Sequence, residues 1–129
     1  MHQPPDNRPV FLNLLQIRFP LSAWLSVGHR ITGLTLFIAL TGYLALLNLL
    51  VFTSIADFNQ LQSHWLVLSL HSVFWIALSF HWLTGLRHLL AEYFTDAKPY
   101  QIINSKPVSQ LLIVCWLVIS GVTLQQVWF

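Results

Sequence analysis

The chain has 129 residues, of which 56% are hydrophobic and only 8% are charged, and its formal net charge is +2. Soluble domains carry about 25% charged residues, so this sequence has too little polar surface for a water-facing globule. The small net charge gives no indication of a nucleic-acid partner. The single cysteine, Cys115, rules out an internal disulfide and a CxxC metal site.

The first 20 residues are polar and contain four prolines, so we expect an N-terminal segment outside the membrane over residues 1–20. The segment lacks the compact apolar core of a signal peptide and the Arg- and Ser-rich composition of a transit peptide. We interpret it as mature sequence, which favours a bacterial or organelle-encoded protein over an imported one.

Three apolar stretches follow, and each is long enough to cross a bilayer as a helix. Their predicted ranges are about 21–55, 63–92 and 107–128. Pro20 suits the first helical position of the first stretch. We see no internal repeat and no low-complexity segment. The sequence therefore predicts an all-α integral membrane bundle of three transmembrane helices, forming one domain over residues 1–129.

All Lys and Arg residues fall on one side of this predicted bundle, because the N-terminal segment and the second loop share a side. They are Arg8, Arg18, Arg30, Arg87, Lys98 and Lys106. The first loop and the C-terminus have none. Lys and Arg are retained on the cytoplasmic side of a membrane, so the N-terminus is predicted to be cytoplasmic, or in the matrix of a mitochondrion.

The start of the first span combines Ser26, His29 and Arg30. Residues four apart lie on one helix face, so Ser26 and Arg30 can together bind an anion or the carbonyl of an amphiphile at the membrane boundary. The alternative is that Arg30 extends to lipid headgroups and that Ser26 hydrogen-bonds to its own helix.

In the second span, His81 precedes Arg87 by six residues and so lies ~9 Å deeper in the membrane. An ionisable residue at that depth is a functional candidate, and a neutral imidazole in an apolar bundle is a natural axial ligand of heme iron. The alternative is a neutral histidine hydrogen-bonded to a neighbouring helix.

The remaining histidines are weaker ligand candidates. His88 lies on nearly the same face as His81, and with Arg87 it can contact heme carboxylates or lipid phosphates, or simply anchor the interface. His71 is expected off that face. Because His29 is expected at the edge and His81 deeper, the chain offers no pair of axial histidines. A second axial histidine would have to come from a partner.

Two motifs resemble the succinate dehydrogenase cytochrome b subunit family. The first consists of Arg8-Pro9-Val10, Leu14, Leu21 and Ser26-x-x-His29-Arg30-x-Thr32. The second is His81-x-x-x-Gly85-Leu86-Arg87-His88-Leu89. The family then tends to an aromatic residue or Met followed by Asp, where this chain has Ala91 and Glu92. With three spans in the expected order, the resemblance covers nearly the whole chain.

The resemblance implies a role for each candidate. His81 is the implied axial ligand of a heme b that is shared with a second anchor subunit. His29 and Arg30 are implied to contact the heme propionates, with His88 nearby. Ser26 and Arg30 are implied to form part of the ubiquinone site, where a hydroxyl can donate to a quinone carbonyl and a guanidinium can stabilise negative charge.

The family also implies the setting of the chain. It would be a subunit that is not catalytic alone, docking an iron–sulfur and a flavoprotein subunit in a complex that oxidises succinate and reduces ubiquinone. The membrane would be the bacterial inner membrane, or the mitochondrial one for an organelle-encoded chain. Two alternatives stay open: the anchor of a quinol-oxidising fumarate reductase, and a structural anchor without heme.

Overall fold

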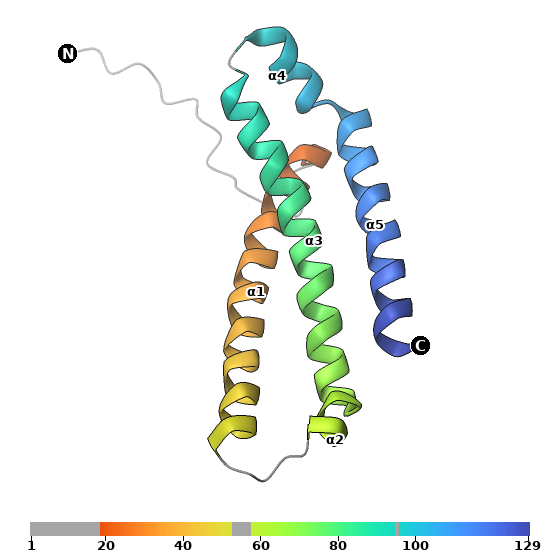
Figure 1. The fold of residues 1–129 in the computed structure, drawn as a ribbon. Coiled ribbons are helices and arrows are strands. Elements are labelled where there is room, and N and C mark those ends of the chain that lie inside the picture. Colours follow the sequence, from red (N-terminus) through yellow and green to blue (C-terminus); the bar gives the residue numbers. More distant parts are fainter. Residues whose placement is uncertain (1–18, 53–57, 95) are drawn as a thin grey trace, which may run out of the picture.

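The computed structural model describes residues 19–52, 58–94 and 96–129, and these residues form helices and short connections without a β-strand (Figure 1). The helices are α1 (Leu21–Phe52), α2 (Phe58–Gln62), α3 (Trp65–Tyr93), α4 (Ala97–Ile103) and α5 (Lys106–Trp128). The three long helices are apolar enough and long enough to cross a membrane. The prediction of an all-α bundle with three spanning helices is confirmed.

The helix boundaries differ from the prediction in detail. Pro20 lies just outside α1, where its carbonyl accepts hydrogen bonds from the backbone N–H groups of Ala23 and Trp24 at 2.9 and 3.4 Å. Pro20 therefore caps the helix. The sequence had suggested that it occupies the first helical position. The short helices α2 and α4 lie where only loops were expected. The predicted end of the first span, at residue 55, falls outside the described residues.

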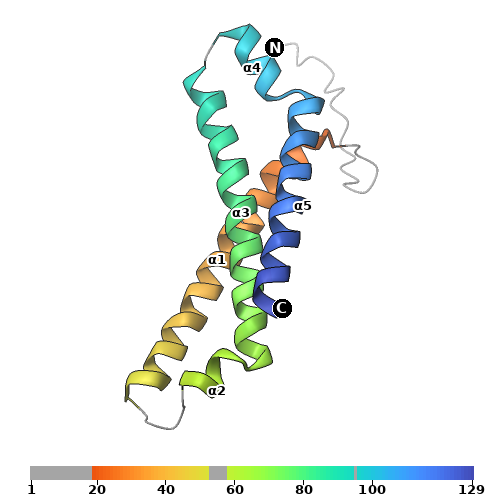
Figure 2. The same ribbon diagram turned by 45° about the vertical axis from the view of Figure 1, so that its right-hand side comes forward.

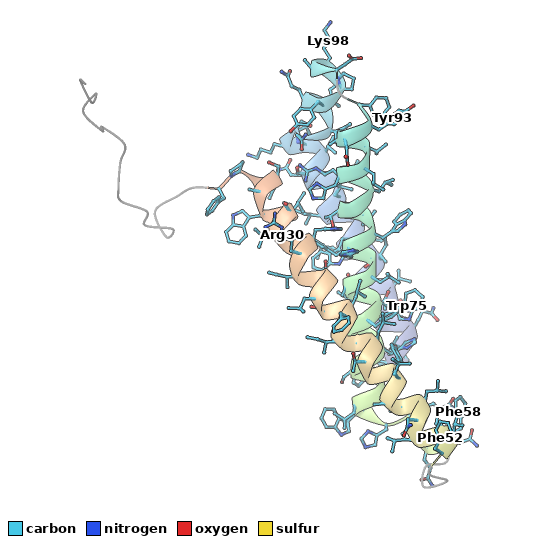
Figure 3. The ribbon with its side chains drawn as sticks, turned by 90° about the vertical axis from the view of Figure 1, so that its left-hand side faces the viewer. Arg30, Phe52, Phe58, Trp75, Tyr93 and Lys98 are labelled. Carbon is cyan, nitrogen blue, oxygen red and sulfur yellow. The ribbon has the colours of Figure 1, made fainter. Side chains whose placement is uncertain are left out.

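Helix α3 is the centre of the bundle, and α1 and α5 both pack against it (Figures 1 and 2). Helix α4 lies at the end of the bundle where α1 and α5 begin and α3 ends, and α2 lies at the opposite end. Figure 3 shows the same axis, with Lys98 at one end and Phe52 and Phe58 at the other. The end of α3 extends beyond the start of α1 toward α4.

The residues buried between the helices are mostly small. The buried set is Leu25, Ala39, Ser72, Ala77, Thr84, Arg87, Ser109 and Ser120. Small side chains let helix backbones approach closely. Helices in a membrane associate through such packing, because lipid tails are as apolar as the side chains and the hydrophobic effect does not drive them together. Most large apolar side chains are exposed on the chain itself. That surface suits lipid or another membrane subunit and not water.

Candidate functional site

The rings of His29 on α1 and His81 on α3 stack on one another, with centroids 3.9 Å apart and planes 14° from parallel. The expectation that His81 lies deeper than His29 is therefore wrong. His29 is eight residues into α1, or ~12 Å, and His81 is twelve residues from the end of α3, or ~18 Å. Because α3 extends past the start of α1, these two depths coincide.

The hydrogen bonds of His81 fix its tautomer. Its Nδ1 lies 3.0 Å from the backbone carbonyl oxygen of His29, which can only accept, so Nδ1 carries the proton. The Thr32 hydroxyl oxygen lies 3.4 Å away as a second acceptor, since its own proton goes to the carbonyls of Gly28 and His29. The Nε2 of a neutral His81 therefore keeps its lone pair.

His29 is held in the same tautomer by the opposite helix. Its Nδ1 lies 2.9 Å from the hydroxyl oxygen of Thr84, a residue that is only 1% exposed. The Thr84 hydroxyl donates its own proton to the carbonyl of Phe80 at 2.7 Å, so it accepts from His29. The Nε2 of a neutral His29 therefore also keeps its lone pair.

Both rings open onto a groove of about 420 Å³ between α1 and α3. The groove is lined by His29, His81, Trp82, Gly85, Leu86, His88, Leu89 and Glu92. The His88 ring lies 5.4 Å from that of His29 at 69°. Three of the predicted site residues, His29, His81 and His88, are thus brought together. The described residues contain no group of three His, Cys, Asp or Glu arranged to hold a metal ion on their own.

Ser26 and Arg30 lie one turn apart on α1, and neither lines the histidine groove. The Ser26 hydroxyl makes no hydrogen bond with the described residues, so the bond to its own helix that was the alternative reading is not seen. The hydroxyls of Thr35 and Thr41, in contrast, do bond to carbonyls four residues back. Arg30 is exposed, on the half of α1 nearest α4 (Figure 3).

Arg87 does not reach the groove. It is 4% exposed and points to the connection between α4 and α5, where its Nε donates to the Ile103 carbonyl at 3.3 Å and its Nη2 to Asn104 Oδ1 at 2.8 Å. Its Nη1 is buried without a partner among the described residues. Arg87 therefore anchors the α4–α5 connection to α3, and is not placed for the lipid or heme contacts that the sequence suggested.

Both ring nitrogens of His71 have hydrogen-bond partners within the chain. Its Nε2 accepts the indole N–H of Trp75 at 3.0 Å, and its Nδ1 donates to the Tyr43 hydroxyl at 2.7 Å. Both ring nitrogens are occupied, so neither offers a lone pair to a metal. This agrees with its lower rank as a ligand candidate.

The family model of the succinate dehydrogenase/fumarate reductase transmembrane subunit matches residues 4–121. This chain belongs to that family. A relative, the succinate dehydrogenase cytochrome b556 subunit of Coxiella burnetii (strain RSA 493 / Nine Mile phase I), is 38% identical over 92 residues, which is 66% of this chain and 70% of the relative. The resemblance inferred from the two motifs is confirmed, and the chain is a multi-pass membrane protein.

One residue of this transmembrane subunit's site was missed by sequence reasoning. Thr84 lies between two motif residues, His81 and Gly85, and a buried threonine in a helix is unremarkable alone. The signal that would have found it is a short repeat: His-x-x-Thr-Gly occurs at residues 29–33 and again at 81–85. The expectation of no internal repeat overlooked this five-residue pattern.

Proposed function

We propose that this chain is the membrane anchor of a succinate dehydrogenase, and that His81 supplies one axial ligand of a heme b. The carrying observation is the bond from His81 Nδ1 to the His29 carbonyl at 3.0 Å. A metal-bound histidine nearly always donates its other ring N–H to a carbonyl or carboxylate, which fixes the tautomer and raises the basicity of the ligating nitrogen. His81 has this arrangement and lines an open groove.

The second axial ligand belongs to another subunit in this proposal. His29 and His81 present their faces to each other, so their nitrogens cannot bind opposite sides of one metal. His71 has both nitrogens occupied, and His88 lies on the same helix as His81, seven residues or ~10 Å along its axis, so it cannot bind the opposite side of that metal. We therefore assign the second histidine to a second membrane anchor subunit. The heme, when bound, would supply one-electron transfer.

Groups in the groove and on the nearby exposed surface of α1 suit the carboxylates of such a heme. Arg30 is always a donor, and His88 lies on the groove toward the α4 end. Neutral His29 turns an acceptor nitrogen to its surroundings, because Nδ1 is committed to Thr84. Neutral His29 can therefore contact a propionate only by accepting, from a bridging water or a protonated carboxyl, while Arg30 and His88 supply the donors.

The quinone contacts are assigned to Ser26 and Arg30. The Ser26 hydroxyl has no hydrogen-bond partner among the described residues, so its proton is available to a quinone carbonyl. Arg30, one turn away, can stabilise the negative charge that develops on a quinone oxygen. Ubiquinone is the substrate implied by the family resemblance.

The α4 end of the bundle is assigned to the cytoplasm, or to the matrix in a mitochondrion. The described cations Arg30, Arg87, Lys98 and Lys106 lie on the half of the bundle nearest α4, and the described residues near α2 and the C-terminus include none. This end would dock the iron–sulfur and flavoprotein subunits, in the bacterial inner membrane or its mitochondrial equivalent. The exposed apolar side chains would face lipid and the second anchor.

The heme assignment is tested by the dithionite-reduced minus oxidised spectrum of the purified complex. We expect a b-type band that is lost in His81→Ala and kept in His71→Gln, a histidine control on the same helix. A complex without the band would instead be a structural anchor, and a band unchanged in His81→Ala would contradict the ligand assignment.

The quinone assignment is tested by two activities of the same preparation. Ser26→Ala and Arg30→Leu should lower succinate-driven quinone reduction while leaving succinate-to-dye electron transfer intact. Thr35→Val, which removes an α1 hydroxyl bonded only to its own helix, is the matched control. An equal loss of both activities would indicate faulty assembly. The fumarate reductase alternative is examined by running the reaction from quinol to fumarate.

A further inference from the structure

The two His-x-x-Thr-Gly segments lie against each other where the antiparallel helices α1 and α3 pack together. The contacts from a histidine ring to a threonine hydroxyl and to a glycine occur in both directions between the segments. His29 faces Thr84, and His81 faces Thr32, with Nδ1 to hydroxyl distances of 2.9 and 3.4 Å. The segments are therefore related by a local twofold pseudosymmetry.

The threonines act alike within this arrangement. Thr32 and Thr84 each donate their hydroxyl proton to the carbonyl four residues earlier in their own helix, at 2.9 and 2.7 Å. The hydroxyl oxygen is then left to accept from the opposite helix. Each threonine can thus hold a histidine only in the Nδ1–H tautomer.

The glycines provide space for the rings. A Cβ at Gly85 would lie 3.1 Å from Cε1 of His29, and a Cβ at Gly33 would lie 3.1 Å from Cε1 of His81. Both distances are tighter than nine in ten real Cβ contacts. Each imidazole therefore rests over a position of the opposite helix that has no side chain.

We infer that these segments form a reciprocal clasp, in which Thr84 is a positioning residue that fixes the tautomer and orientation of His29 beside His81. Nothing in the two predicted motifs assigns Thr84 a role. Its effect on a bound heme rests on the proposed function of His81, whereas its effect on the His29 ring does not.

The clasp has an asymmetry that makes it testable. His81 has two acceptors, the His29 carbonyl at 3.0 Å and Thr32 at 3.4 Å, while the hydrogen bond of the His29 ring is to Thr84. Loss of the Thr84 hydroxyl should therefore release His29, whereas loss of the Thr32 hydroxyl should leave His81 held by the carbonyl. Thr84 should be the more sensitive of the two positions.

The experiment compares Thr84→Val, Thr84→Ser and Thr32→Val in the assembled complex, with Thr35→Val as control. Thr35 makes the same bond to its own helix but none across helices. The first readout is the ¹⁵N-histidine solid-state NMR spectrum, in which His29 is identified by its loss in His29→Gln. The second is the midpoint potential of the b-type band. If Thr84→Val fails to assemble, Thr84→Ala removes the hydroxyl at smaller volume.

The clasp predicts that Thr84→Val moves the His29 signals away from the Nδ1–H tautomer, and that Thr84→Ser restores them. It also predicts about a tenfold change in relative affinity for the oxidised and reduced heme, which corresponds to ~59 mV for one electron. An unchanged His29 tautomer in Thr84→Val, or Thr84→Ser behaving like Thr84→Val, would overturn the inference. If the wild-type complex had no b-type band but Thr84→Val still changed the His29 tautomer, the heme assignment would be refuted and the clasp would stand.

Discussion

Adding one methyl group at Gly85 should separate the cost of crowding His29 from the ordinary benefit of alanine in a helix. An ideal Cβ there lies 3.1 Å from His29 Cε1, which is 0.3 Å inside the 3.4 Å where ordinary contact begins. His29 cannot retreat freely, because its Nδ1 is bonded to Thr84 and its face is stacked on His81. The ring must shift by a few tenths of an ångström, or these contacts must lengthen.

The magnitude follows from two opposing terms. Replacing a helical glycine by alanine gains about 1 kcal/mol of intrinsic helix stability. Inserting a methyl group into a well-packed contact costs about 1–3 kcal/mol. The net effect at Gly85 should therefore lie between about zero and 2 kcal/mol of destabilisation. At Gly121, where a Cβ meets nothing within 4 Å, only the favourable term applies on this chain.

The assay is thermal loss of the proposed b-type band from the purified complex, followed for Gly85→Ala and Gly121→Ala. We expect Gly85→Ala to lower the midpoint temperature or leave it unchanged. We expect Gly121→Ala to raise the midpoint temperature slightly. Gly33→Ala, which crowds His81 by the same distance, should resemble Gly85→Ala. If Gly85→Ala stabilised the complex as much as Gly121→Ala, the close contact between His29 and α3 would be wrong.

Two further predictions concern the packing around this site. Gly28→Ala would place a Cβ 2.7 Å from Phe80 Cε1, and Phe80 is edge-on to Trp116 at 5.2 Å. Crowding should cost about 1–3 kcal/mol and helix propensity return about 1 kcal/mol, so we expect a net destabilisation of up to about 2 kcal/mol in the same thermal assay. A midpoint above wild type would contradict this expectation. Asn104→Ala should cost about 1–3 kcal/mol because it leaves Nη2 of Arg87 buried without its partner, whereas Asn104→Asp keeps an acceptor and adds a countercharge. Faster proteolysis between α3 and α5 in Asn104→Ala, but not in Asn104→Asp, would support the anchoring role of Arg87, and equal rates would refute it.

The fold and several site residues were predictable from the sequence because lipid leaves few choices. A backbone in hydrocarbon must satisfy its own hydrogen bonds, so an apolar stretch of span length becomes a helix. The charge distribution also sorted the two ends of the bundle. His81 and His29 were identifiable because ionisable side chains are costly in a membrane and are retained there for a reason. The family match covers the motifs that contain them.

The level of each histidine was decided only by the tertiary structure. Where α1 lies along α3 depends on how small residues and ring contacts interlock across the pair, and no local pattern encodes that offset. The offset placed His29 against His81, made the buried Thr84 a hydrogen-bond partner, and turned Arg87 toward the α4–α5 connection. The sequence by itself determined which residues are candidates for the chemistry, and packing between the helices determined which of them meet.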